Sequence, residues 1–192
     1  MTRKRAILWS STGVVLVAVV VVAAALFQPW RLFTNTTVDD ALPPGETTLT
    51  STATAEPAAS APTETPAPAA SADPVYTDLA RGSFITHEHE TSGSVRLVQQ
   101  PDGSRVLAIA GLDTSDGPDL RVWLSDQPVI EGVDGWHVFD DGRYLELGAL
   151  KGNLGDQVYE IPADADLAGF QSVSIWCARF AVSFGAATLA PI

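Results

Sequence analysis

A run of 21 uncharged residues near the N-terminus sets the first constraint on this chain. Residues 7–27 read ILWSSTGVVLVAVVVVAAALF, and a helix of that length spans roughly 31 Å, about the thickness of a bilayer's hydrocarbon core. Arg3, Lys4 and Arg5 stand directly before it, and the positive-inside rule keeps such an end in the cytoplasm. The sequence predicts a cytoplasmic tail over 1–6, a transmembrane signal-anchor helix over 7–27 and an extracytoplasmic remainder, in a single-pass protein of the cell membrane.

A cleaved signal peptide is the alternative reading of the same run. Its end offers the small residues Ala23, Ala24 and Ala25 to a peptidase. Apolar regions of secretory signals usually have about 7–15 residues, so the greater length here favours an uncleaved anchor. In both cases the rest of the chain is expected to be exported.

The next segment, residues 28–74, is predicted to be a disordered linker. From residue 36 onward it is rich in Ala, Thr and Pro and contains no aromatic side chain. Such a composition buries too little apolar surface to offset the entropy lost on ordering. In an extended polyproline-like form, residues 36–74 would reach at most roughly 120 Å.

The folded part is predicted to be one all-β domain, residues 75–192. It holds 17 acidic and seven basic residues, a balance that repels nucleic acid. Short β-rich runs alternate with turn-forming Pro-Asp-Gly, Asp-Gly and Gly-Asn segments, a pattern typical of an antiparallel β-sandwich or barrel-like domain. The predicted strands are 82–88, 94–99, 105–112, 119–125, 143–148, 157–162, 172–180 and 186–190.

Four motifs in this region resemble a known family. GSFITHEHETSGSV, GPDLRVWLS, LELGALKGNLGDQVYEIP and SVSIWCARFAVSFGAATL follow one another in that order. Over about residues 82–189 they resemble the DM-thirteen domain, a family classed as an electron-transfer domain. The resemblance implies an all-β domain in exported or membrane-attached proteins, sometimes joined to cytochrome-like modules. It also implies that Cys177, in the IWC motif, is the suspected redox residue, and it places His89 at the family's motif histidine.

Cys177 is the only cysteine in the chain, so it has no partner for a disulfide within its own molecule. On a strand, Arg179 shares the face of Cys177 and would lower the pKa of the thiol, whereas Trp176 points to the opposite face. An exposed thiol outside the cytoplasm is prone to form a sulfenate or a mixed disulfide. The alternative is a small buried core residue, which is the commoner role of a free cysteine.

An electron-transfer role raises the possibility of copper or haem as a cofactor. If 87–90 is a strand, His87 and His89 point the same way and, with Cys177, form the trigonal ligand set of blue copper. The weak axial methionine of that site is missing, because the only methionine is Met1. A single cysteine also excludes the C-x-x-C-H motif that attaches haem covalently, which leaves a non-covalent axial histidine, methionine or cysteine, for which no sequence feature argues. The alternative is a pair of solvated histidines.

Three aspartates in the loop GLDTSDGPDL raise the further possibility of calcium. Asp113, Asp116 and Asp119 are spaced three residues apart, and carboxylate oxygens are ligands that calcium prefers. Aspartates beside Gly-Pro more often stabilise turns, and the spacing does not match an EF-hand.

The sequence thus supports two hypotheses of different classes. In the first, an extracytoplasmic domain takes part in electron transfer or thiol redox chemistry through Cys177, with a redox partner protein. In the second, the domain is a non-enzymatic surface binding or adhesion module, and Cys177 is a core residue. A turnover enzyme is not predicted, because no hydrolase or phosphate-binding motif occurs in the sequence.

Overall fold

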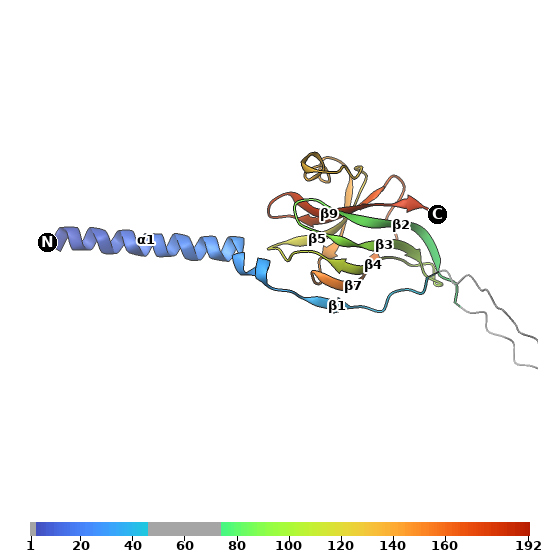
Figure 1. Ribbon diagram of the computed structural model, residues 1–192, viewed down its shortest axis with the longest axis horizontal. Coiled ribbons are helices and arrows are strands. Elements are labelled where there is room, and N and C mark those ends of the chain that lie inside the picture. Colours follow the sequence, from blue (N-terminus) through green and yellow to red (C-terminus); the bar gives the residue numbers. More distant parts are fainter. Residues whose placement is uncertain (1–2, 46–73) are drawn as a thin grey trace, which may run out of the picture.

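The computed structural model describes residues 3–45 and 74–192, without the side chains of residues 3–14, 32 and 33. Helix α1, Arg3–Phe27, covers the predicted anchor, and a 3₁₀ helix, η1, Pro29–Phe33, follows it (Figure 1). In the described part of the chain, no helix meets both the length and the apolarity that crossing a membrane requires.

The domain is all-β, as predicted. Each of the eight predicted runs overlaps a strand, and two short strands were not foreseen, β1 and β10. The strands are β1 Thr37–Asp39, β2 Thr77–Thr86, β3 Ser92–Gln99, β4 Arg105–Asp113, β5 Leu120–Ser125, β6 Tyr144–Ala149, β7 Leu154–Ile161, β8 Ser172–Cys177, β9 Val182–Thr188 and β10 Ala190–Pro191.

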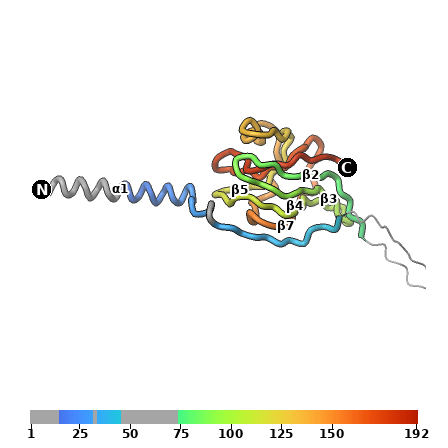
Figure 2. The backbone as a smooth tube through the Cα atoms, viewed as in Figure 1, coloured from blue at the N-terminus to red at the C-terminus, as the bar shows by residue number. Residues whose placement is uncertain are grey.

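The strands form one curled sheet, ordered β1-β7-β4-β3-β2-β9-β8-β5-β6, with β10 beside β2. All strand pairs are antiparallel except β1 with β7, which is parallel. The long central strand β2 connects the two halves, because it pairs with β3 along most of its length and with β9 at its end. Figure 2 shows the backbone curling around the interior.

Two apolar clusters hold the sheet together. The main core lies inside the curl and receives residues from nearly every strand, including Cys177 on β8. A second cluster lies on the other face of β8, where residues 126–143 fold back over the sheet; its buried members are Trp123, Phe139, Trp176 and Ala186. Strand β8 is therefore buried on both faces, which explains its continuous apolar and small-residue composition.

Residues 28–45 are not a disordered linker, and the prediction is wrong for this part of 28–74. Thr37–Asp39 form β1 and pair with Leu154–Asp156 of β7. A three-residue strand has no alternating pattern long enough to read from sequence, and β7 supplies the hydrogen-bonding edge that orders it. The rest of the predicted linker, 46–73, lies outside the described residues.

The strand directions separate two ends of the domain. The α1-side end consists of residues 87–91, 114–119, 150–153 and 178–181, which connect strands next to the point where η1 reaches the sheet (Figure 1). The distal end holds the turn 100–104 and the start of β2. Because β1 runs parallel to β7, it carries the chain from the α1-side end to the distal end.

Candidate functional site

Cys177 is the last residue of β8 and lies in the main core at the α1-side end. It pairs with Leu120 of β5 and Val182 of β9, and its exposed fraction is 0%. The sulfur is therefore enclosed by protein in the resting structure, as the core-residue alternative predicted. Trp176, its neighbour, packs in the second cluster on the opposite face, which confirms the predicted alternation.

Opposing influences act on the ionisation of this thiol. Burial raises the pKa of Cys177 above its ordinary value, because a thiolate is poorly solvated in the core. The backbone N–H groups of Phe180, Arg179 and Asp119 act in the opposite direction, and the negative charge of Glu88 adds to the increase. The resting sulfur is a neutral thiol, and the backbone N–H groups beside it favour any negative charge that forms on it.

Arg179 does not share a strand face with Cys177, contrary to the prediction. β8 ends at Cys177, and Arg179 lies in the exposed turn to β9. The turn is closed by the Phe180 N–H, which donates to the Cys177 carbonyl at 3.2 Å, and by Ala181, whose φ of 50° is left-handed. The backbone N–H of Arg179 lowers the pKa of the Cys177 thiol, so this residue acts through its main chain.

His87 and His89 are not on a strand, because β2 ends at Thr86 and the chain bends through 87–89. Both backbone N–H groups donate to the carbonyl of Phe184. The His87 side chain is buried, with 4% exposed. The His89 ring lies instead on the Phe184 ring, with centroids 3.9 Å apart. The two imidazoles thus have different surroundings, and the strand geometry behind the copper hypothesis is absent.

A buried polar chain that sequence reasoning missed begins at His87. Its Nδ1 lies 2.9 Å from Ser183 Oγ, and Ser174 Oγ lies 3.0 Å from the same oxygen. Both serines are fully buried, and His87 Nε2 has no hydrogen-bond partner. Burial lowers the pKa of His87, so the imidazole is held neutral. The serines occur in β-rich runs of ordinary composition, so no spacing signal marks them.

The three loop aspartates have separate structural tasks. Asp116 pairs with Arg31 at 3.3 Å and accepts from the N–H of Gly117. Asp119 pairs with Arg121 at 2.7 Å. Asp113 is an exposed residue at the end of β4. These contacts match the turn-stabilising alternative to the calcium hypothesis.

All the predicted site residues nevertheless lie at or beside the α1-side end: Cys177, Arg179, His87, His89, Asp113, Asp116 and Asp119. Among the described residues, no group of three His, Cys, Asp or Glu side chains is placed to hold a metal ion. Cys177 faces the apolar core, while the Nδ1 of His87 is occupied by Ser183. The residues present do not fit a copper site.

A family model decides the classification of the domain. The model described as Electron transfer DM13 matches residues 83–189. The chain belongs to this family. Neither the curated proteins nor the solved structures yield a match. The DM13 match contains β3–β9 and the part of β2 that pairs with β9, while β1 precedes it.

Proposed function

We propose that this DM13 protein is an electron-transfer domain of the membrane surface, in which Cys177 is the redox-active group. The observation that carries the proposal is the arrangement around the sulfur. One thiol, screened from bulk water, lies at the end of the domain nearest α1, where backbone N–H groups oppose the increase in its pKa that burial causes. The family's description as an electron-transfer domain supports the role, and the enclosed position of the sulfur excludes a bulky disulfide as its oxidant.

The redox step that fits this environment is two-electron oxidation by a hydroperoxide. The Cys177 sulfur, after losing its proton, attacks the nearer peroxide oxygen; the S–O bond forms, the O–O bond breaks, and the leaving hydroxide takes the proton and becomes water. The product is a sulfenic acid. A dithiol partner returns it to the thiol, releasing a second water and becoming a disulfide. The backbone N–H groups of Arg179 and Asp119, which lower the pKa of the thiol, stabilise the anionic sulfur during attack.

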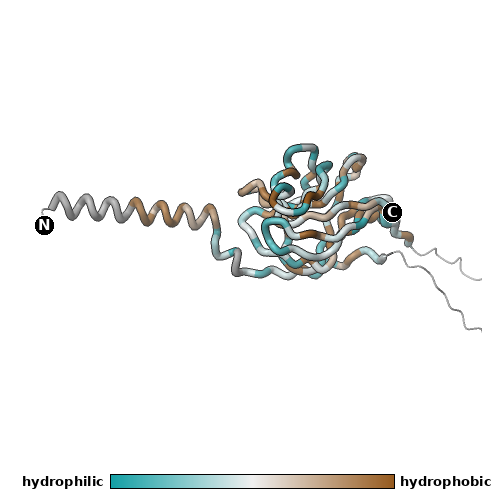
Figure 3. Tube along the Cα trace, turned by 45° about the horizontal axis from the view of Figure 1, so that its top comes forward, coloured by the Kyte–Doolittle hydropathy of each residue, from teal (hydrophilic) through white to brown (hydrophobic). Residues whose placement is uncertain are grey.

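Anchoring by α1 is the second element of the proposal. The uncharged run 7–27 and the basic residues before it support insertion with the N-terminus in the cytoplasm. The described side chains of α1 add an observation, because apolar residues on all sides of the helix are 56–63% exposed: Val15, Leu16, Val17, Val21 and Val22. Figure 3 shows this apolar segment standing outside the domain. Lipid is the environment that covers such a surface.

Trapping of the sulfenic acid tests the redox role. The full chain, reconstituted in lipid vesicles, is treated with hydrogen peroxide and a cyclic dione, and the Cys177 peptide is weighed by mass spectrometry. We expect the dione adduct in the folded protein, and none in Cys177→Ser. An adduct that forms only after addition of denaturant contradicts the proposal.

That contrary result would support the second candidate function, a surface binding module. The observation in its favour is that Cys177 lies at 0% exposure among core side chains, where a thiol packs as a small apolar group. In that case Cys177→Ala changes stability and leaves ligand binding unchanged.

A further inference from the structure

Residues 29–45, called the clamp below, connect α1 to the domain by contacts at three successive places. The first is the loop 114–119, next to η1. There Arg31 Nη1 donates to the Gly117 carbonyl at 3.1 Å and pairs with Asp116 at 3.3 Å, while Thr34 Oγ1 donates to the other Asp116 oxygen at 3.2 Å. The helix end is thereby tied to the α1-side end of the sheet.

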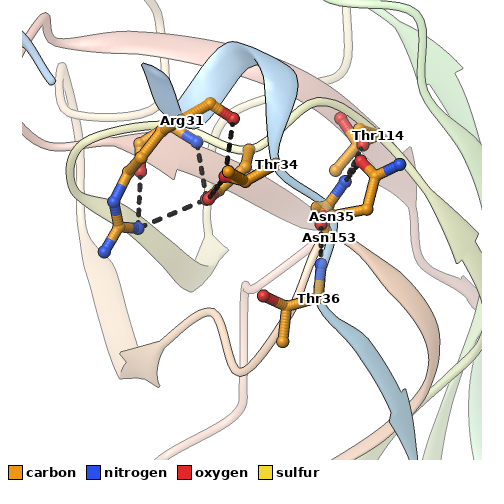
Figure 4. A network of polar contacts seen from close by, with 8 residues as sticks. Arg31, Thr34, Asn35, Thr36, Thr114 and Asn153 are labelled. Atoms are coloured by element: carbon orange, nitrogen blue, oxygen red, sulfur yellow. Dashed lines mark hydrogen bonds and ion pairs between the residues drawn. The ribbon is translucent and has the colours of Figure 1, made fainter. Parts of the chain in front are cut away.

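The second place is the side chain of Asn153, which is 1% exposed. Its Oδ1 accepts from the Thr36 N–H at 2.7 Å, and its Nδ2 donates to Asn35 Oδ1 at 2.9 Å and to the Thr114 carbonyl at 2.8 Å. Figure 4 shows this amide between the clamp and the loop after β4. A buried amide with all these partners fixes the position of the clamp, because moving the clamp leaves polar groups unpaired.

The third place is β1 and the residues after it. β1 pairs with β7, and Asp40 then accepts from Lys151 Nζ at 2.5 Å and from the Val158 N–H at 2.9 Å. The hydrogen bond from Lys151 lowers the pKa of Asp40. Further on, Arg96 donates to the carbonyls of residues 43 and 44. The clamp therefore follows the sheet edge through to the distal end.

The helix itself contacts the turn that encloses Cys177. The rings of Phe27, the last residue of α1, and Phe180 stack with centroids 5.9 Å apart and planes 9° from parallel. Phe180 is 46% exposed, Phe27 54% and Trp30 52%. Aromatic side chains with this exposure, at the end of an apolar helix, are suited to the interface between lipid and water.

We infer that the clamp holds the domain with its α1-side end against the bilayer, so that the turn 178–181 and the Cys177 beneath it meet the lipid surface. The inference rests on the proposed anchoring by α1. The linker prediction would let residues 46–73 set the distance between the domain and the membrane. Both Gly45 and Thr77, which flank this segment, lie toward the distal end, so the length of the segment does not separate the domain from the membrane. A redox partner of Cys177 is then a component held in or at the membrane.

Two labels on one strand measure this orientation. Ser92 and Gln99 are exposed residues at opposite ends of β3, and seven residues of strand separate them by roughly 23 Å. Ser92→Cys and Gln99→Cys are each labelled with a fluorophore in the full chain, and the chains are placed in vesicles that contain nitroxide-headgroup lipids. The parent chain, with buried Cys177 alone, gives the background labelling. We expect the label at Ser92 to lose at least twice as much fluorescence as the label at Gln99.

Two variants release the clamp in different ways. Thr36→Pro removes the N–H that binds Asn153 and leaves the domain's own sequence intact. Gly152→Ala places a Cβ 2.4 Å from the Thr36 carbonyl oxygen and 2.8 Å from Val38 Cγ2, a separation that real Cβ atoms do not show. Each is expected to bring the ratio of the two quenching values toward one, with near-parental circular dichroism. Gly103→Ala is the control: it strains the backbone of a distal turn, where φ is 86°, but leaves every clamp contact intact, so it is expected to keep the parental ratio.

The outcomes separate the two proposals. A chain that does not float with the vesicles overturns the anchoring and this inference together. A chain that floats but shows equal quenching at both labels, or stronger quenching at Gln99, overturns the orientation alone. An unchanged ratio in both clamp variants shows that the clamp does not set the orientation.

Discussion

Replacing Cys177 by Ser and by Ala tests whether backbone N–H groups reach the sulfur position. Cys177→Ala removes one buried heavy atom, about the size of a methylene group, and leaves a small cavity; together these are expected to lower the free energy of unfolding by about 1–2 kcal/mol. In an apolar site, Cys177→Ser would carry an additional cost of about 1–3 kcal/mol for the unpaired hydroxyl. Here the backbone N–H groups of Arg179 and Asp119 lower the pKa of the thiol, and we expect them to donate to that oxygen.

One such hydrogen bond contributes about 1 kcal/mol. We therefore expect Cys177→Ser to be within about 1 kcal/mol of Cys177→Ala. Val173 provides the matched control, because it lies on the same strand and core face and is also 0% exposed. At that position, inside the ladder, Ser is expected to be less stable than Ala by about 1–3 kcal/mol.

The assay is denaturant unfolding of the full chain in detergent, followed by tryptophan fluorescence, with the four variants compared at one pH below 8. If the Ser variant has a lower free energy of unfolding than the Ala variant by the same amount at both positions, no donor reaches the side chain at position 177. The explanation of sulfur stabilisation given above would then be refuted.

Two further predictions concern buried polar groups. Burial lowers the pKa of His87 below its ordinary 6.5, so the unfolded chain binds a proton at a higher pH than the folded one, and stability present above pH 6.5 is lost as pH falls below it. His87→Gln, which keeps a partner for Ser183 but does not titrate, should flatten this loss in urea unfolding measured between pH 7.5 and 5; an unchanged slope would contradict the assignment. Asn153→Ala removes the amide that joins the clamp to Thr114, and we expect a loss of about 2–3 kcal/mol in thermal denaturation. A loss no larger than that of an exposed Asn35→Ala would show that the Asn153 amide contributes little.

The sheet could be predicted from the sequence because its strands carry a local signal. Runs such as 105–112 and 119–125 combine β-branched and large apolar residues and are separated by turn formers, so each strand is visible without its partners. The family motifs lie in the same runs. What such patterns do not contain is the strand order or the curl, which depend on contacts between distant runs.

The candidate site was predicted less well, because its geometry depends on where strands end. His87 and Arg179 each stand one or two residues beyond the last residue of a strand, where the alternation of side-chain directions no longer applies. Sequence could not show that β8 would be buried on both sides, since the cover comes from residues 126–143. It also could not show β1, because Thr37–Asp39 acquire strand structure only through β7.

The clamp has a mechanical consequence as well. Tension that pulls α1 away from the sheet acts along β1, and a strand loaded along its own direction opposes the force with all its ladder hydrogen bonds at once. As long as they hold, the load passes from the helix into β7. Once they break, the 28 residues between Gly45 and Pro74 are added to the tether, and fully extended they provide roughly 100 Å of new length. The connection between α1 and the sheet is therefore short and stiff below a threshold force and becomes a long tether above it.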